Sequence, residues 1–364
     1  MLKSRQSGID SGKNLCYYNF AFYRNVCAIV FPERFDIMKD RISITDIARL
    51  AGVSSSTVSH VLNQTRYVSP EITQKVMQIV ADTGYHKNRL ACSLRQKHTN
   101  TIGIILPSLH AGTYYGKSLE AIERELSAHG YNLIMKASSN DPQAEKDAIE
   151  YLLSWKVDGI IIVLSDNSYD YSQIPCPVVL IDRAPEKQTV SGFYIDNYSI
   201  TCQAMEQMLQ KGYRRIALIS PTPVFAPTKH RIQGYQDTLA RHDLPIRQEH
   251  ICCGVATMED GRRFAQRIVQ DTDADAVLIL SSPMTVGAMS YWNENGVRIP
   301  QDLGVMTFAD YDWIRLSNPQ LCGVIQPNRL VGECAARQMC RLLQGDREIV
   351  TQFLPCQYFE GKSL

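Results

Sequence analysis

Seven short apolar runs recur between Ile102 and Phe308, and they constrain the fold more than any other feature of the sequence. They cover residues 102–107, 131–135, 158–164, 178–182, 214–220, 276–280 and 304–308. Amphipathic helical segments lie between many of them, for example residues 118–130 and 147–155. Buried parallel strands read as short continuous runs of Ile, Val and Leu, and their alternation with helices indicates a doubly wound α/β fold. Because the strands are too many for one sheet of ordinary size, the pattern predicts two lobes that divide near residues 196–200.

The segment over residues 43–96 follows another pattern, that of short helices. Ser43 and Asp46 form an S-x-x-D variant of the capping box, and Gly52 is placed to end the helix that they begin. Two residues after Gly52 a second helix begins, SSTVSHVLN, for which Ser54 is the predicted N-cap. Two helices joined by so tight a glycine-containing turn predict a helix-turn-helix.

Two further helices complete this predicted domain. One begins at about Ser69 with Pro70 in its first position, and a short one covers residues 88–95. The apolar periodicity predicts these core positions: Ile44, Ile47, Ala48, Ala51, Val58, Val61, Leu62, Ile72, Val76, Ile79 and Val80. The second helix is therefore predicted to expose Ser55, Ser56, Ser59 and His60.

The charge is uneven along the chain. The whole sequence carries a formal net charge of +1, which indicates no polyanionic partner for the protein as a whole. Between Lys39 and Lys97, however, nine basic residues face four acidic ones, a local surplus of five. A basic patch on a helix-turn-helix indicates a nucleic-acid interface rather than an ordinary helical subdomain.

Other classes of protein find little support. The eleven cysteines contain no C-x-x-C pair, which indicates free thiols in a reducing compartment and no structural metal. The sequence lacks a correctly spaced P-loop, a G-x-G-x-x-G fingerprint and a G-x-S-x-G elbow, so we expect neither an enzyme nor a cofactor. The most apolar early segment, residues 16–31, carries Asn19, Arg24 and Asn25, so we expect no membrane span.

Residues 1–37 match no pattern that follows. We interpret them as an extension that is not native or is disordered, with Met38 as the natural start, and the alternative is a partner-binding arm. We then expect a helix-turn-helix domain over residues 38–86, a hinge helix and linker over 87–100, and a two-lobed core over 101–364. Within the core, the first lobe takes about residues 101–198 and 327–354. The second takes about 199–326 and the C-terminus.

The run ITDIARLAGVSSSTVSHVLNQTRYVS, followed by GYHKNRLACSLR and IGIILP, resembles the lactose repressor family of bacterial regulators. Later segments agree with it, namely DGIII, GYRRIALIS, RIQGY, RIPQDLGVMTF and the P-x-L that leads into VIQP. The TVSHV form resembles the purine and ribose repressor branch. The resemblance begins at about residue 42 and continues to the carboxyl end. It implies an N-terminal all-α DNA-binding domain and a core like the periplasmic binding proteins.

The resemblance assigns DNA-binding roles by position. Ser55, Ser56 and His60 fall where the family reads bases in the major groove. Ser54, Thr57, Ser59 and Asn63 fall where it contacts phosphates. The hinge helix that folds on operator DNA corresponds to residues 88–95, with Asn88, Arg89 and Ala91 among its contacts. Leu94 falls where the family inserts a leucine into the minor groove and kinks the duplex.

Two residues depart from the family in the hinge. Lys87 replaces the usual proline, which loosens the start of the helix. Cys92 replaces a polar residue and removes one phosphate contact. We interpret Cys92 as a passive thiol, and a redox switch is the alternative.

The resemblance also assigns a ligand site between the lobes, where the carboxyl ends of the strands meet. Its predicted residues are Tyr114, Tyr115, Asp182, Arg183, Asp196, Arg231, Ser281, Ser282 and Asp310. Tyr114 and Tyr115 fall where the family stacks aromatic rings on a sugar or base, and Arg231 falls where it grips ligand oxygens. Ser281, Ser282 and Ala309 replace residues that are often Asn or Asp in the family. The basic residues Arg183, Arg231, Lys229 and His230 are present. A cleft with fewer carboxylates and these cations favours an anionic ligand, such as a sugar acid or sugar phosphate.

The sequence therefore predicts a cytoplasmic, homodimeric regulator that represses a carbohydrate operon and is controlled by a small effector. Its partners are double-stranded operator DNA and that effector. The alternative function is a two-lobed sugar-binding protein without a role on DNA.

Overall fold

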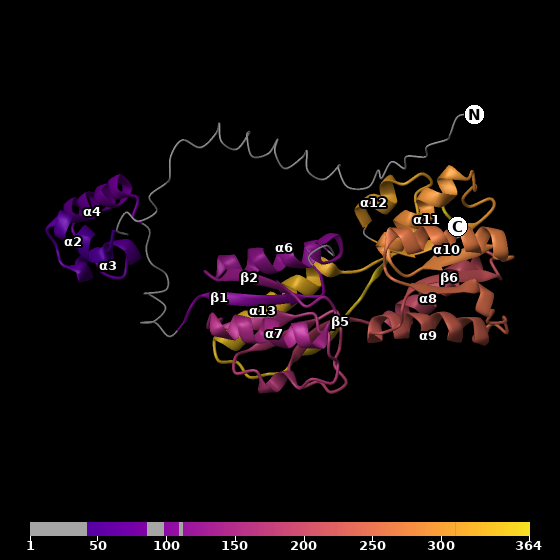
Figure 1. Ribbon diagram of the computed structural model, residues 1–364, viewed down its shortest axis with the longest axis horizontal. Helices are drawn as coiled ribbons and strands as arrows, with labels where there is room; N and C mark the ends of the chain where they lie inside the picture. Colours follow the sequence, from indigo (N-terminus) through magenta and orange to yellow (C-terminus); the bar gives the residue numbers. More distant parts are fainter. Residues whose placement is uncertain (1–41, 86–97, 109–111, 310) are drawn as a thin grey trace, which may run out of the picture. The chain divides into compact units, whose positions relative to one another are not determined.

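The computed structural model describes residues 42–85, 98–108, 112–309 and 311–364. The chain divides into two compact units, residues 1–88 and 89–364. The first unit holds three described helices, α2 (Ile44–Ala51), α3 (Ser55–Asn63) and α4 (Pro70–Thr83), drawn in indigo in Figure 1. The predicted short helix over 88–95 lies outside the described residues.

The caps of the first unit confirm the predicted helix ends. Ser43 and Asp46 form the complete capping box of α2, which ends at Gly52 with φ +69°. Ser54 caps α3, and Ser69 caps α4 with proline in its first turn. The left-handed backbone at Gly52 explains why a glycine stands in the turn, since other residues rarely adopt it.

The core of the first unit is small and gathers one face of each helix. Ile47, Val58 and Val76 are fully buried at its centre. Leu62, Ile72, Ile79 and Val80, which the pattern assigned to the core, pack at its margin and are only partly buried. Ser55, Ser59 and His60, expected to be exposed, are also half-buried. With so few helices, most side chains of the unit lie at the boundary between core and solvent.

The second unit contains two six-stranded sheets. The strands of the first sheet, in the order β11-β5-β4-β3-β1-β2, are β1 (Thr101–Leu106), β2 (Asn132–Ala137), β3 (Gly159–Ile162), β4 (Val178–Ile181), β5 (Ser191–Ile195) and β11 (Thr351–Leu354). Helices α6 (Gly112–Ala128) and α13 (Asn328–Leu343) cover one face, and α7 (Pro142–Ser154) covers the other. A short 3-10 turn, η1 (Tyr171–Gln173), follows β3.

The second sheet has the order β12-β10-β9-β8-β6-β7. Its strands are β6 (Ile216–Pro221), β7 (Ile251–Gly254), β8 (Ala276–Ile279), β9 (Gly304–Phe308), β10 (Cys322–Ile325) and β12 (Gln357–Phe359). Helices α8 (Asn197–Gln210) and α9 (Ala226–Arg241) pack on one face, and α10 (Met258–Asp271) and α11 (Ser282–Glu294) on the other (Figure 1). The turn η2 (Gln248–His250) precedes β7, and α12 (Tyr311–Leu316) follows β9.

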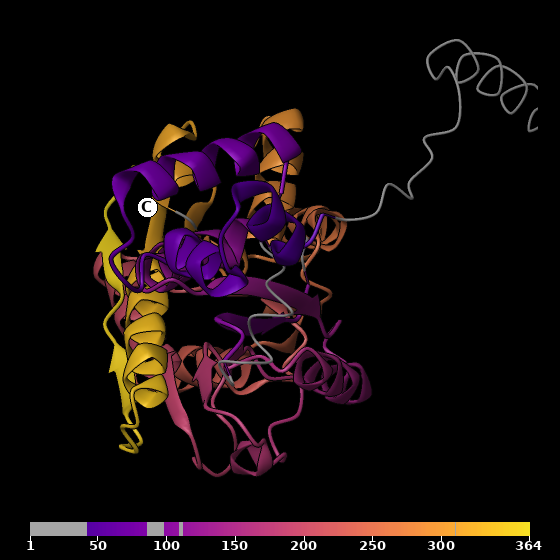
Figure 2. The same cartoon turned by 90° about the vertical axis from the view of Figure 1, so that its left-hand side faces the viewer.

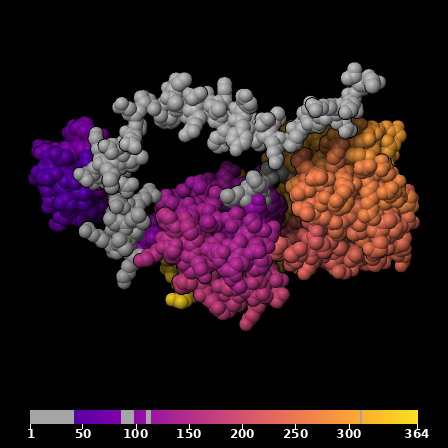
Figure 3. All heavy atoms as spheres, viewed as in Figure 1, coloured from indigo at the N-terminus to yellow at the C-terminus, as the bar shows by residue number. Residues whose placement is uncertain are grey.

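The sheets confirm the predicted doubly wound class with one correction. All pairs are parallel except β12 with β10, which is antiparallel. Antiparallel edge strands are common on otherwise parallel sheets, because a strand that joins the edge needs no helical crossover. The space-filling view shows the two lobes as adjoining bodies, magenta and orange (Figure 3).

Three short segments carry the chain from one lobe to the other. They are Asp196 between β5 and α8, Gln326 and Pro327 between β10 and α13, and Pro355 and Cys356 between β11 and β12. The last of these joins the edge strands of both sheets, and Figure 2 shows this C-terminal segment in yellow at the left of the view. No helix among the described residues is long and apolar enough to cross a membrane.

Candidate functional site

The start of α3 carries a cluster of hydroxyl groups. Ser54 Oγ accepts a hydrogen bond from the backbone N–H of Thr57 at 3.1 Å. The same oxygen lies 2.7 Å from Ser56 Oγ and 2.8 Å from Thr57 Oγ1. Hydroxyl groups at the amino end of a helix can turn toward a phosphate, which the helix dipole also favours. Three of the predicted phosphate and base contacts are therefore held together at one end of the helix.

Farther along α3, the predicted contacts are fixed by local hydrogen bonds. His60 Nδ1 lies 2.9 Å from Thr65 Oγ1, which sets the plane of the imidazole ring. Asn63 Nδ2 donates to the Ser59 carbonyl at 2.8 Å and to its hydroxyl at 3.1 Å. These bonds reduce the side-chain entropy that would be lost on binding DNA.

The loop after α3 presents a residue that the sequence pattern did not single out. Tyr67 is 86% exposed, although tyrosine usually buries most of its ring. In the sequence, the signal for Tyr67 as a candidate DNA contact is its place beside Arg66, in a turn that follows the predicted reading helix. The hinge residues Asn88, Arg89, Ala91 and Leu94, and also Lys87 and Cys92, lie outside the described residues.

The second candidate site is a cavity of about 420 Å³ between the lobes. The first lobe contributes Tyr114 and Lys117 from α6. The other lining residues are Met258, Ser282, Pro283, Val286, Ala309, Asp312, Trp313, Ile325, Gln326 and Asn328. A cavity of this size suits a monosaccharide or a ligand of similar size.

A chain of hydrogen bonds runs behind this cavity and connects the two lobes. The hydroxyls of Tyr114 and Tyr115 lie 2.9 Å from the two carboxylate oxygens of Asp182. Tyr114 Oη also lies 2.7 Å from Gln326 Oε1, which accepts from Arg231 Nη2 at 3.2 Å. Burial, followed by the charge of Asp182, raises the pKa of both tyrosines well above the ordinary value, so both remain protonated donors.

Asp182 reaches the tyrosines from a strained position. Its φ is +67°, in the left-handed region that few residues other than glycine adopt. Its backbone N–H donates to the Phe193 carbonyl at 3.1 Å, and the next N–H, of Arg183, donates to Ile181 at 2.7 Å. Aspartate tolerates this conformation better than most side chains, and such strain occurs often at ligand sites.

The two predicted cleft arginines stack on aromatic rings. The guanidinium of Arg183 lies 3.6 Å from the centroid of Phe225, which belongs to the other lobe, and donates to the Leu164 carbonyl at 2.9 Å. Arg231 lies 4.2 Å from the ring centroid of Phe308. Both arginines are thereby held in fixed orientations.

The structure brings most predicted ligand residues together, but not all. Tyr114 and Ser282 line the cavity, while Tyr115, Asp182 and Arg231 are joined to it through the hydrogen-bond chain.

Two other predicted residues have local roles, and one lies outside the described residues. Asp196 is the N-cap of α8, where it accepts from the Ser199 N–H at 3.0 Å, and it does not line the cavity. Ser281 is buried at the start of α11. Asp310 lies outside the described residues.

Gln326 and the ion pair of Lys117 with Asp312 were missed from the sequence. Gln326 stands in the VIQP segment, directly after a buried strand, and this position is the signal that identifies it.

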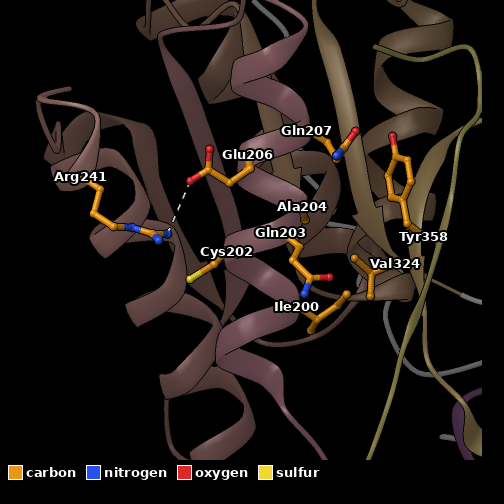
Figure 4. Close-up of a pocket in the computed structure, with 9 residues that line it drawn as sticks. All are labelled: Ile200, Cys202, Gln203, Ala204, Glu206, Gln207, Arg241, Val324 and Tyr358. Carbon is orange, nitrogen blue, oxygen red and sulfur yellow. Dashed lines mark ion pairs between the residues drawn. The ribbon is translucent and has the colours of Figure 1, made fainter.

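A second cavity, of about 430 Å³, lies within the second lobe around α8. Figure 4 shows Arg241 and Glu206, an ion pair at 3.7 Å, on one side of the helix and Tyr358 and Gln207 on the other. None of the predicted ligand residues lines it.

A helix-turn-helix unit followed by two lobes that meet at a cavity defines a ligand-responsive, DNA-binding regulator of transcription. Two family models match the chain. Residues 43–88 match the bacterial regulatory proteins of the lacI family, and residues 99–360 match the periplasmic binding proteins and sugar binding domain of LacI family. The chain belongs to the lacI family.

Individual relatives align with this chain over most of their length. Catabolite control protein A of Staphylococcus xylosus is 29% identical over 83% of this chain and 92% of its own. The ribose operon repressor of Haemophilus influenzae is 28% identical over 84% of this chain and 93% of its own. Among solved structures, a complex of the transcriptional regulator CelR with cellobiose has a TM-score of 0.66 at 25% identity and covers 89% of this chain and all of that one.

Proposed function

We propose that this protein is a homodimeric repressor of a carbohydrate-catabolism operon, controlled by a small ligand in the cavity between its lobes. The observation that carries the proposal is the chain of hydrogen bonds from Asp182 through Tyr114 and Gln326 to Arg231. Tyr114 and Gln326 both line the cavity, so a ligand that binds there competes for the bonds that join the lobes.

Ligand binding and DNA binding are coupled through the start of the first lobe. Strand β1 begins at Thr101, directly after the predicted hinge over residues 87–100. A ligand that favours one angle between the lobes shifts the hinge between its folded and unfolded forms. The coupling is reciprocal, so a ligand that weakens operator binding is itself bound more weakly by the DNA-bound protein.

The proposed ligand is a sugar or a sugar derivative. Two similar proteins have names that point to carbohydrates, the ribose operon repressor and the regulator crystallised with cellobiose. One helix-turn-helix reads one half-site, so two copies of the chain on a near-palindromic operator are the simplest functional assembly. Such a protein acts in the cytoplasm.

The main alternative is a ligand-binding protein without a role on DNA. The ordered hydroxyl cluster at the start of α3 and the basic surplus over residues 39–97 favour the regulator. An enzyme is less well supported. The described residues that line the cavity include no nucleophile paired with a base, and the relatives are named a control protein and a repressor.

The test is recovery of bound DNA. The full chain is incubated with sheared genomic DNA of its source organism at low salt, where phosphate contacts are strongest, and the retained fragments are sequenced. We expect a shared near-palindrome beside sugar transport or catabolism genes, and its loss in Ser56→Glu, which places a carboxylate against the phosphates. If the wild-type chain enriches no sequence, with or without a sugar extract, while it still binds a sugar, the alternative is correct.

A further inference from the structure

Arg231 is a buried cation whose hydrogen bonds to the described residues all go to neutral groups. Its side chain is 8% exposed, and among the described residues no other arginine or lysine is buried. Nε donates to Asn197 Oδ1 at 2.7 Å, Nη1 to the Leu280 carbonyl at 3.1 Å and Nη2 to Gln326 Oε1 at 3.2 Å. The structure shows no ion pair between Arg231 and a described carboxylate. Burial of a charge without a counter-charge is costly, so Arg231 favours an anionic partner beyond the described residues that it contacts.

The surface arginines of the same lobe show the contrast. Arg262 pairs with Glu294 and Arg298 with Asp302, both at 2.5 Å and both with exposed side chains. This lobe therefore pairs these exposed arginines with carboxylates, where the gain is small, whereas no described carboxylate pairs with the buried one. Asp182 does not fill this role for Arg231, because its ion pair is with Arg183, at 4.0 Å, and none joins it to Arg231.

The side-chain oxygen of Gln326 lies where an oxygen of an anionic ligand would fit, between Tyr114 and Arg231. Gln326 Oε1 lies 2.7 Å from the hydroxyl of Tyr114 on one lobe and 3.2 Å from Nη2 of Arg231 on the other. Gln326 also lines the cavity, so a ligand can reach this point. The wall of the cavity includes the uncharged Ser282 and Ala309, and the carboxylate among its described lining residues, Asp312, is paired with Lys117.

We infer that the effector carries a carboxylate or phosphate group, one oxygen of which replaces Gln326 Oε1 between Tyr114 and Arg231. The inference rests on the proposed function and specifies the ligand class of the same cavity. An anion completes the site because it supplies a charge opposite to that of Arg231 and accepts from its guanidinium, and charge-assisted hydrogen bonds are stronger than neutral ones. Tyr114 has a single hydroxyl proton, so it donates to the anion only when that proton turns from Asp182 to the ligand. A neutral hydroxyl would replace the glutamine oxygen but leave the buried cation uncompensated.

The first test needs no ligand. Gln326→Glu places a carboxylate of nearly the same shape beside Arg231, and Gln326→Met is the matched control without an acceptor oxygen. We expect the glutamate variant to unfold at a higher temperature than wild type by roughly 2–4 °C, and the methionine variant at a lower one. A glutamate variant less stable than wild type at neutral pH would overturn the inference, because Arg231 would then have its counter-charge already.

The second test uses pairs of ligands that differ in charge. Calorimetry on the full chain compares D-gluconate and D-glucose 6-phosphate with D-glucose, and D-galacturonate with D-galactose, with inorganic phosphate as the smallest probe. We expect at least one anion to bind about tenfold or more tightly than its neutral partner, and to lose about tenfold or more in Gln326→Glu. A carboxylate ligand and a phosphate ligand are distinguished by which member of the set responds.

The two proposals fail in different ways. If a neutral sugar binds and releases operator DNA while its acid and phosphate do not, the inference is wrong and the proposed function stands. If none of the anions binds, the inference is wrong. If an anion binds as expected but the chain never enriches a DNA sequence, the proposed function is wrong and the anionic site stands.

Discussion

Lys117 Nζ lies 2.8 Å from Asp312 Oδ2, and this ion pair joins α6 of the first lobe to α12 of the second. Both residues line the cavity between the lobes. The two side chains are 41% and 73% exposed. Exposed ion pairs contribute little free energy, so a ligand in the cavity can break this pair at small cost.

A double-mutant cycle on this pair measures its strength. We expect Lys117→Met and Asp312→Asn to show a coupling free energy of about 0.5 kcal/mol in urea unfolding. The coupling disappears near 1 M salt, where the screening length is about 3 Å.

The control is the exposed Arg298 and Asp302 pair, which lies within one segment of the second lobe. Its removal leaves ligand affinity unchanged, whereas the loss of Lys117 changes it. A coupling above about 2 kcal/mol would show that the pair is far less solvated than its exposure indicates.

Ser54 separates stability from DNA recognition in the first unit. Ser54→Ala removes the acceptor for the Thr57 N–H and costs the helix-turn-helix unit about 1 kcal/mol. Ser54→Asp restores the cap but places a carboxylate where the family contacts phosphates. We expect circular dichroism melting to show a recovered unit and a gel-shift assay on the recovered operator to show weak binding. If the aspartate variant binds the operator as wild type does, Ser54 is only a cap.

Two glycines of the first lobe predict opposite effects of one substitution. A methyl group at Gly103 would lie 2.6 Å from Leu152 Cδ1, because α7 packs directly against β1 there. Gly103→Ala therefore destabilises the lobe by about 1–3 kcal/mol. Gly116, within α6, has open space around it, and Gly116→Ala gains up to about 1 kcal/mol of helix propensity. Calorimetric unfolding of both variants tests the pair, and equal effects would contradict the packing described.

Glu145 makes the stability of the first lobe depend on pH. Its burial outweighs the hydrogen bonds from Tyr171 and Ser165 and raises the pKa of its carboxyl. The unfolded chain therefore releases this proton at a lower pH than the folded protein does. Stability from this group is complete below the ordinary glutamate pKa and is lost as pH rises through the folded-state pKa.

The measurement is urea unfolding of wild type and Glu145→Gln from acid to neutral pH. We expect the difference in unfolding free energy to change by about 1.4 kcal/mol for each unit by which the pKa is raised. The exposed Glu123→Gln is the control for removing one carboxylate. Parallel curves for wild type and Glu145→Gln would mean that the carboxyl titrates as it does in the unfolded chain.

Apolar runs predicted the strands whose sequence is rich in Ile, Val, Leu or Met, including β2 at the edge of its sheet. All seven correspond to strands, namely β1, β2, β3, β4, β6, β8 and β9. The pattern missed β5, β7, β10, β11 and β12. These are short and contain Ser, Gly, Cys, Thr or Gln, and β11 is largely exposed at the edge of its sheet. Their pairing partners stabilise them, which no local periodicity reveals.

The sequence predicted individual residues of the site but not the contacts between them. Resemblance indicated Tyr114, Asp182 and Arg231, but Gln326 joins two of them from a segment more than two hundred residues after Tyr114. Asp196, predicted as a ligand contact, caps α8 and does not line the cavity, and the sequence alone does not distinguish a cap from a contact. Only the folded arrangement distinguishes these roles.

The edge strands β11 and β12 follow one another at the carboxyl end, and each completes a different sheet. During synthesis the ribosome therefore delivers an edge strand of each lobe only after all the other described strands of both sheets have been made. The helix-turn-helix unit uses contiguous residues and can fold as soon as it emerges. Nascent chains would then acquire a structured DNA-binding head long before a working sensor, and a premature stop near residue 350 would release that head with neither lobe complete.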